Sequence, residues 1–210
     1  MTRPVVFIDD DEFERRSCTD VLKEIFYGTT IRIEPLAPLP TLADYSVLIA
    51  KNAMSALILD ERLNTAGGVA YTGAELATHL RAIGSKLPIV ILTNFPDDDF
   101  TNQEWAVECI FQKKKVLNDP VSPAAQLFKA RFSRQIEIAG AVLAEGEQRF
   151  HDLLVKSMKA PLTAEEEKEL GILEDERLVP MQAQELPDAK ALEKAIEELK
   201  TKLNPDELNL

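Results

Sequence analysis

The sequence predicts an α/β protein built on a doubly wound, parallel sheet of five strands. Short apolar runs alternate with amphipathic stretches along the first 117 residues, which is typical of this fold class. The apolar runs are nearly continuous, as expected of strands that are buried on both faces. The expected strands are residues 5–8, 30–34, 56–60, 87–93 and 109–113.

The first three elements follow from the start of the chain. The stretch VVFI (5–8) is uniformly apolar and predicts a buried strand. Over residues 12–26 the apolar side chains recur near one face, which predicts an amphipathic helix. β-Branched residues predict a strand over 30–34, and the proline-rich EPLAPLP (34–40) is expected to close it.

The same alternation continues through the middle of the chain. ALILD (56–60) predicts an apolar strand that ends in a carboxylate, and LPIVILT (87–93) is the strongest strand of the sequence. A last short strand, CIFQK, is expected at 109–113. Helices are expected between these strands over residues 42–53, 73–83 and 101–107.

The sequence changes character after Pro123, where a long helix is expected. Residues 124–158 are helix-permissive, interrupted only by Gly140 and Gly146, and extend further than the closing helix of such a domain requires. We therefore expect the N-terminal domain to comprise residues 1–135.

A second, helical and acidic region is expected over residues 136–210. Thr163 and Glu166 have the spacing of a capping box, in which two side chains satisfy backbone groups at a helix start. The stretch AKALEKAIEELKTKL (189–203) predicts an amphipathic helix. Such a helix would pair with a second copy, giving a homodimer, dock in a groove of a partner, or pack on its own domain.

Composition and charge argue against several classes of protein. The formal net charge of −12 argues against binding to nucleic acid or to an anionic membrane surface. No apolar run approaches the roughly 18 residues expected of a membrane-spanning helix. The two cysteines do not support a disulfide framework. We therefore expect a soluble, cytoplasmic protein that binds neither nucleic acid nor membrane.

Polar residues follow the apolar strands at the ends that a parallel sheet brings together. Asp9 and Asp10 follow the first strand, and Asp60 ends the third. Thr93 ends the fourth strand, and the lysines of QKKK (112–115) lie at the end of the fifth. Open parallel sheets bind their ligands at this edge. Carboxylates suit Mg²⁺, whereas a lysine and a hydroxyl suit the oxygens of a phosphoryl group.

Four motifs, taken in order, resemble the receiver domains of two-component response regulators. They are IDDDEFERR (8–16), LILDERL (57–63), TGAELATHLRAIGSKLPIVILT (72–93) and CIFQK (109–113). The resemblance covers about residues 1–135 and implies a flavodoxin-like receiver fold. It also implies a regulator rather than an enzyme, with at most slow hydrolysis of its own phosphoryl group.

The resemblance assigns the acidic residues to a phosphorylation site that depends on Mg²⁺. Asp60 would accept a phosphoryl group from a phosphohistidine of a histidine kinase or a phosphotransfer protein. Asp10 and Asp60 would bind the cation directly, and Asp9 would bind it through water. The backbone carbonyl of Arg62 would complete the shell, and the cation would relieve the repulsion among the carboxylates.

The resemblance also assigns a threonine and a lysine to the phosphoryl oxygens. Thr93 would donate a hydrogen bond, and the lysine would form an ion pair. Lys113 is the preferred lysine, because the alternative, Lys114, would put Gln112 at a core position. With Lys113 in this role, Phe111 is expected to pack under the sheet.

Two features depart from the pattern of the family. The loop over residues 64–73 is several residues longer and lacks the usual proline. Its Gly67-Gly68 and Tyr71 suggest a mobile lid or a partner contact, with a benign insertion as the alternative. Asn94 follows Thr93 at a position where the family prefers a small residue, which would slow phosphoryl transfer or its loss.

Other functions are compatible with the same residues. Asp9 and Asp11 give the D-x-D pattern of a phosphatase resembling the haloacid-dehalogenase superfamily, which leaves Asp60 unexplained. A receiver fold that is never phosphorylated and serves only as a binding module is a further alternative. The run from Asp9 to Asp11 would also suit the cap of the following helix. No basic recognition helix is apparent, so output through contacts with an unknown effector protein is expected.

Overall fold

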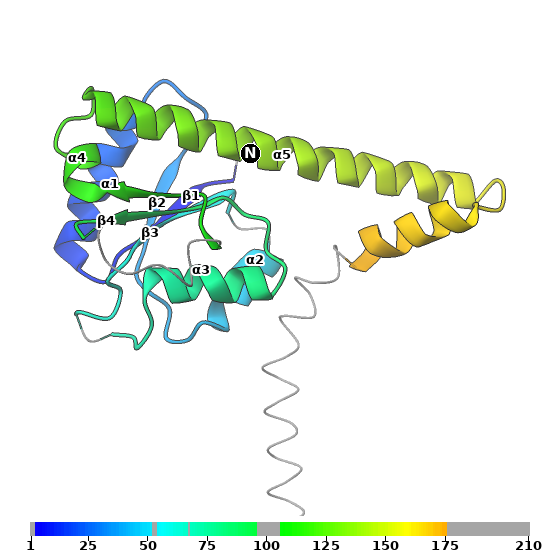
Figure 1. Ribbon diagram of the computed structural model, residues 1–210, viewed down its shortest axis with the longest axis horizontal. Coiled ribbons are helices and arrows are strands. Elements are labelled where there is room, and N and C mark those ends of the chain that lie inside the picture. Colours follow the sequence, from blue (N-terminus) through cyan, green and yellow to red (C-terminus); the bar gives the residue numbers. More distant parts are fainter. Residues whose placement is uncertain (1–2, 52–53, 67, 96–105, 176–210) are drawn as a thin grey trace, which may run out of the picture.

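The computed structural model describes residues 3–51, 54–66, 68–95 and 106–175, and its centre is a five-stranded parallel sheet (Figure 1). The strands are β1 (Val5–Ile8), β2 (Ile33–Leu36), β3 (Ala56–Asp60), β4 (Ile89–Thr93) and β5 (Cys109–Gln112). Their order, β2-β1-β3-β4-β5, is that of a flavodoxin-like sheet. The predicted fold class is therefore confirmed.

Helices cover both faces of the sheet, with α2 and α3 on one side and α1 and α5 on the other (Figure 1). The helices are α1 (Glu12–Ile25), α2 (Asp44–Ala50), α3 (Gly73–Ala82), α4 (Lys113–Leu117) and α5 (Pro123–Ser157). Two of the expected helices cannot be compared with the structure. The one at 101–107 lies for the most part outside the described residues, and the one at 189–203 lies entirely outside them.

The alternation of side chains along β3 divides the core into two layers. Leu57 and Leu59 pack with Leu80 of α3 on one face. Ile58 packs on the other face, in the same cluster as Phe128 of α5. Because successive strand residues point to opposite faces, a strand between two layers of helices has to be apolar throughout.

The second strand lies further along the chain than the sequence indicates. β2 begins at Ile33 rather than at Thr30, and it includes Pro35, a residue expected to follow the strand. β2 lies at the edge of the sheet next to β1, with Pro35 opposite Phe7. An edge strand tolerates proline where the missing N–H faces away from the neighbouring strand.

The long loop between β3 and α3 is closed by a buried tyrosine pair. Tyr71 is 6% exposed, and its hydroxyl donates to the carbonyl oxygen of Leu39 at 2.5 Å. It also lies 3.0 Å from the hydroxyl of Tyr45 in α2. The burial of Tyr71 contradicts a role for its side chain as a lid or a partner contact, whereas Gly67 of the same loop lies outside the described residues. The side chain of Tyr71 anchors the inserted loop to the core.

The last helix of the sheet domain, α5, runs unbroken through Gly140 and Gly146 for 35 residues and extends well beyond the sheet (Figure 1). The domain boundary expected after residue 135 falls inside this helix, and the packing of α5 against the sheet extends to Ile136. Residues 164–175 form a helix that doubles back along the distal part of α5. Within the described residues, no helix is long and apolar enough to span a membrane.

Two ion pairs hold the returning helix against α5. Arg149 contacts Glu169 through Nε–Oε1 and Nη2–Oε2 distances of 2.8 and 2.6 Å. Lys156 Nζ lies 2.6 and 2.7 Å from the two carboxylate oxygens of Glu166. The predicted capping box is confirmed, because the backbone N–H groups of Thr163 and Glu166 donate to each other's side chains at 3.0 and 3.3 Å.

Candidate functional site

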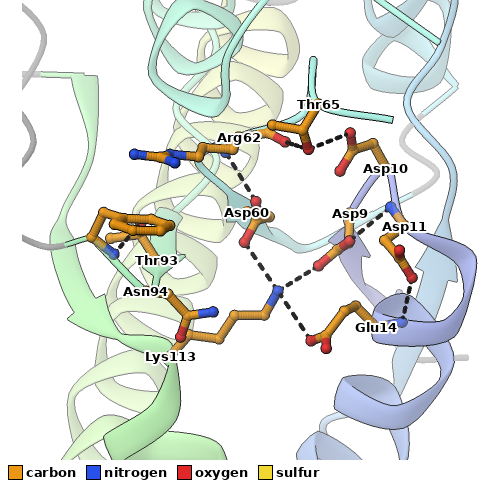
Figure 2. A pocket seen from close by; sticks show the side chains of 11 residues that line it. Asp9, Asp10, Asp11, Glu14, Asp60, Arg62, Thr65, Thr93, Asn94 and Lys113 are labelled. Atoms are coloured by element: carbon orange, nitrogen blue, oxygen red, sulfur yellow. Dashed lines mark hydrogen bonds and ion pairs between the residues drawn. The ribbon is translucent and has the colours of Figure 1, made fainter. Parts of the chain in front are cut away.

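A pocket of about 310 Å³ opens at the edge of the sheet where the strands end (Figure 2). All the residues that the sequence assigns to the site line this pocket, because the carboxyl ends of parallel strands meet at one edge. The lining residues are Asp9, Asp10, Asp11, Glu14, Asp60, Arg62, Thr65, Thr93, Asn94, Phe95 and Lys113.

A single lysine bridges two carboxylates in the pocket. Lys113 Nζ lies 2.6 Å from Asp9 Oδ2 and 3.0 Å from Asp60 Oδ1. Its distance to Glu14 Oε2 is 3.8 Å. Lys113 is the first residue of α4 rather than the last of β5. Lys114 is exposed on the same short helix. The geometry therefore selects Lys113 as the lysine of the pocket.

Burial makes the charges of this bridge depend on one another. The side chains of Lys113, Asp9 and Asp60 are 7, 2 and 14% exposed. Burial by itself lowers the pKa of Lys113, but the charge of Asp60 and the hydrogen bond to Asp9 outweigh burial and raise this pKa. Burial also raises the pKa of Asp9, and Lys113 opposes this rise without cancelling it. Asp60 is thus the more accessible carboxylate and faces a charged ammonium.

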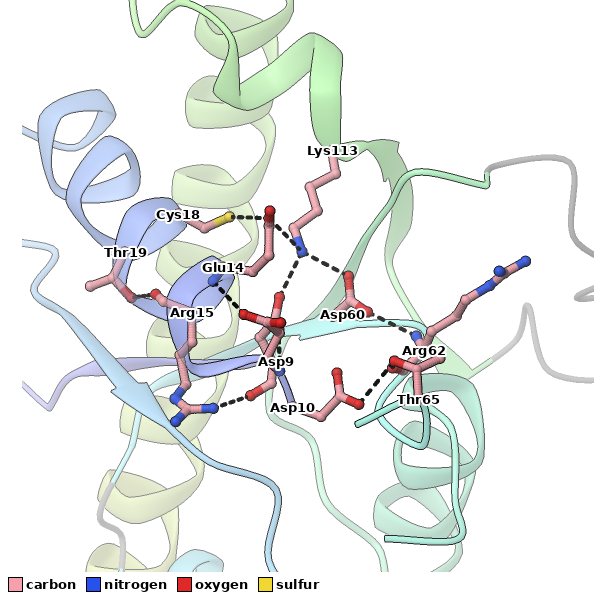
Figure 3. A network of polar contacts seen from close by, with 11 residues as sticks. Asp9, Asp10, Glu14, Arg15, Cys18, Thr19, Asp60, Arg62, Thr65 and Lys113 are labelled. Carbon is pink, nitrogen blue, oxygen red and sulfur yellow. Dashed lines mark hydrogen bonds and ion pairs between the residues drawn. The ribbon is translucent and has the colours of Figure 1, made fainter. Parts of the chain in front are cut away.

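Asp10 is held by the loop that follows β3. Its Oδ2 accepts a hydrogen bond of 2.6 Å from the backbone N–H of Ala66 and lies 3.0 Å from the hydroxyl oxygen of Thr65. The same hydroxyl lies 3.1 Å from the carbonyl oxygen of Arg62. Two oxygens that the resemblance assigns to a cation therefore converge on one point (Figure 2, Figure 3).

The chemistry of these donors fits a hard cation such as Mg²⁺. The candidate ligands are the carboxylates of Asp9, Asp10 and Asp60 and the carbonyl of Arg62, and all of them are oxygens. In the observed conformation these oxygens accept hydrogen bonds, and no group of three or more acidic, histidine or cysteine side chains within the described residues is arranged to hold a metal. Binding would require Asp10 to exchange its bonds to the Thr65 loop for the cation.

The backbone at Asp60 is fixed by the start of α3. The N–H of Gly73 donates to the carbonyl oxygen of Glu61 at 2.9 Å, and the Glu61 carboxylate accepts from the N–H of Ala74 at 3.0 Å. A Cβ atom at position 73 would lie 2.3 Å from the carbonyl oxygen of Asp60. Only glycine permits this close approach of α3 to the end of β3.

Replacing Gly73 with alanine is expected to lower the free energy of unfolding by at least about 1–3 kcal/mol, because the new Cβ meets backbone that cannot yield easily. Gly68→Ala is the matched control, since a Cβ there meets nothing within 4 Å. The control is expected to leave the stability unchanged or raise it by up to about 1 kcal/mol. Urea unfolding followed by circular dichroism compares the two, and equal stabilities would show that the close approach is not required.

Residues at the end of β4 form another wall of the pocket. Thr93 is 1% exposed, and its Oγ1 accepts a hydrogen bond of 3.0 Å from the N–H of Phe95. A hydroxyl that accepts a hydrogen bond can still donate its proton. The guanidinium carbon of Arg62 lies 3.5 Å from the centre of the Phe95 ring. Asn94 lines the same wall, and within the described residues its buried Oδ1 has no hydrogen-bond partner.

Helix capping accounts for Asp11 but not for its two neighbours. Asp11 is the N-cap of α1 and accepts a hydrogen bond of 2.8 Å from the N–H of Glu14. Asp9 instead turns into the pocket, with its Oδ1 accepting from the N–H of Asp11 at 3.0 Å and its carbonyl oxygen accepting from Arg15 at 2.6 Å (Figure 3). Asp10 contacts the loop after β3. The capping alternative is therefore correct for one of the three aspartates.

Three residues of the pocket, Glu14, Thr65 and Phe95, were not predicted from the sequence. Glu14 lies in the first turn of α1, four residues after Asp10, and its place beside Lys113 depends on how that helix begins. Thr65 comes from the long loop between β3 and α3, which lies outside the four motifs of the resemblance. The run of acidic residues at the start of α1 is the signal that points to Glu14.

No model of a known protein family matches the chain, and no curated protein matches it in sequence. A function is therefore inferred from the fold, the geometry of the pocket and the resemblance of the four motifs.

Proposed function

We propose that the chain is a response-regulator-like signalling protein in which Asp60 accepts a phosphoryl group in a Mg²⁺-dependent reaction. The observation that carries this proposal is the ammonium of Lys113, which lies 3.0 Å from Asp60 Oδ1 and is shared with Asp9. The donor would be a phosphohistidine of a histidine kinase or a phosphotransfer protein. The phosphorylated chain would then act through an effector protein.

The proposed reaction is a transfer between two protein side chains. A carboxylate oxygen of Asp60 attacks the phosphorus, a P–O bond forms, the P–N bond of the phosphohistidine breaks, and the leaving imidazole takes up a proton from solvent. Lys113 is positioned to pair with a phosphoryl oxygen, and the Thr93 hydroxyl to donate to another. When bound by Asp10, Asp60 and the other oxygens of the pocket, Mg²⁺ would offset the charge on the transferring group.

The connection of Lys113 to α5 supplies a route from this site to a partner surface. Lys113 begins α4, and Val116 of the same short helix is buried in the cluster that contains Phe128 of α5. A phosphoryl group on Asp60 would draw Lys113 away from Asp9. Because Lys113 begins α4, its displacement would act on the helix that packs directly against α5.

The phosphatase alternative finds less support in the pocket. It needs Asp9 as nucleophile, yet the Asp9 side chain is 2% exposed and lies 2.6 Å from Lys113. It also needs Asp11 as acid and base, yet Asp11 caps α1. Asp60, the acceptor of the preferred proposal, is the more exposed of the two bridged carboxylates.

Incubation with acetyl phosphate and Mg²⁺ is expected to raise the intact mass of the wild-type chain by about 80 Da, the mass of one phosphoryl group. The gain is expected to disappear without Mg²⁺ and in Asp60→Asn, because that variant lacks the nucleophilic oxygen. Asp11→Asn is the matched control and is expected to keep the gain, since asparagine caps a helix as well as aspartate does.

Two other outcomes point to the alternatives. Phosphate release that persists in Asp60→Asn and is lost in Asp11→Asn favours the phosphatase. No mass gain with any small phosphoryl donor, from a folded protein that binds Mg²⁺, favours the binding module.

A further inference from the structure

The part of α5 between the sheet domain and the returning helix carries an exposed apolar surface. Residues 138–144, IAGAVLA, are seven consecutive residues without a polar side chain, and we call them the apolar collar. Ile138, Val142 and Leu143 are 47, 54 and 50% exposed. Because seven residues make about two helical turns, the collar presents apolar groups on every side of the helix.

The described parts of the chain leave most of the collar uncovered. The packing of α5 against the sheet extends to Ile136, before the collar begins. The returning helix approaches α5 mainly beyond the collar (Figure 1): an added Cβ at Gly146 would lie 3.9 Å from Leu173, and of the collar residues Val142 lines the groove between the two helices. Contiguous exposed apolar groups of this kind mark interaction surfaces in soluble proteins.

The composition of the collar favours close packing against another helix. Four of its seven residues are small, namely Ala139, Gly140, Ala141 and Ala144. A Cβ at Gly140 would meet nothing within 4 Å, so the described packing of the chain does not require glycine there. Glycine inside a helix costs about 0.5–1 kcal/mol relative to alanine. A second helix lying close to the collar would account for a glycine at this position.

The charges on either side of the collar are complementary to each other. Residues 129–137 on its N-terminal side carry three basic residues and one acidic residue. Residues 145–152 on its C-terminal side carry three acidic residues and one basic residue, Arg149, which is already paired with Glu169. Two copies of α5 that cross in opposite directions at the collar would place each basic flank beside an acidic flank.

We propose that two copies of the chain associate through antiparallel packing of their apolar collars, with a two-fold axis close to Ala141. Such an interface is self-complementary, as in most homodimers. The predicted amphipathic segment 189–203 is a weaker candidate for covering the collar. Its three glutamates lie between lysines near both of its ends, so it has no acidic end to match the basic flank. The dimer does not depend on phosphorylation of Asp60.

Sedimentation and light scattering of the full chain test the interface. The wild-type chain is expected to have twice its mass of 23.4 kDa, and Leu143→Glu to have the single mass, with an unchanged circular dichroism spectrum. Val121→Glu is the matched control, because Val121 is 78% exposed but precedes α5, and it is expected to remain dimeric. A monomeric wild-type chain, or a dimer that survives Leu143→Glu, would overturn the proposal.

Charge reversal tests the antiparallel orientation without introducing charge into the collar. Replacing Arg131 and Arg134 with glutamate is expected to raise the dimer dissociation constant about tenfold or more, because each reversed flank would face an acidic one. Adding Glu145→Arg and Glu147→Arg is expected to restore the affinity of the wild type. A parallel dimer pairs like flanks, so it would show no loss in the first variant and would overturn the antiparallel arrangement.

Discussion

Replacing Lys113 with methionine is expected to lower the free energy of unfolding by about 3–5 kcal/mol, because the substitution leaves two buried carboxylates without their shared cation. The side chains of Asp9 and Asp60 are only 2 and 14% exposed, so water cannot replace the ammonium fully. Methionine keeps an unbranched apolar stem, and the loss therefore reflects charge more than packing. Urea unfolding without divalent cations measures this loss of stability.

The same variant tests whether these carboxylates hold Mg²⁺. The proposed site has one positive charge fewer after the substitution, so Mg²⁺ is expected to restore a large part of the lost stability by binding the folded state. Lys114→Met is the matched control, since Lys114 is exposed, and it is expected to change the stability by no more than about 0.5 kcal/mol. A Lys113→Met variant as stable as this control, or one whose stability does not change when Mg²⁺ is added, would contradict the electrostatics assigned to the pocket.

Replacing Phe128 with alanine is expected to lower the free energy of unfolding by about 3–5 kcal/mol, because it leaves a cavity in the cluster that joins α5 to the sheet. The Phe128 ring is fully buried and packs edge-to-face on Phe26 and Phe111, with centroid distances of 5.8 and 5.1 Å. It also stacks on Phe132 at 5.7 Å. The contact with Phe111 confirms that this residue packs under the sheet as predicted from the position of Lys113.

A neighbouring residue of α5 provides the comparison. Leu127 is 48% exposed, so Leu127→Ala in the same turn of the helix is expected to change the stability by no more than about 0.5 kcal/mol. Urea unfolding of both variants separates burial from helix propensity, which changes little at either site. Equal losses of unfolding free energy in the two variants would show that α5 is not anchored through this cluster.

The buried strands and the residues at their ends are the features that the sequence predicts well. Strands covered on both faces have to be apolar throughout, so ALILD (56–60) and IVILT (89–93) stand out against their surroundings. Because parallel strands end at one edge, Asp9, Asp60, Thr93 and Lys113 could all be placed at that edge before the strand order was known. All four line the same pocket.

The features that the sequence predicts poorly are decided by tertiary contacts. Pro35 lies inside β2 because that strand is at the edge of the sheet, which composition does not reveal. Tyr71 is buried because its hydroxyl forms a hydrogen bond with the hydroxyl of Tyr45 in α2. The bond between the Thr65 loop and Asp10 spans 55 residues, and no local spacing rule predicts such a contact.

The most direct test of the proposed function is to locate the phosphoryl group on the chain. Borohydride reduces an acyl phosphate to an alcohol, which converts a phosphorylated aspartate into homoserine that mass spectrometry of peptides can place. After treatment with acetyl phosphate and Mg²⁺, homoserine is expected at position 60 and at no other aspartate. Homoserine at position 9, or a phosphorylated chain without homoserine, would contradict Asp60 as the acceptor.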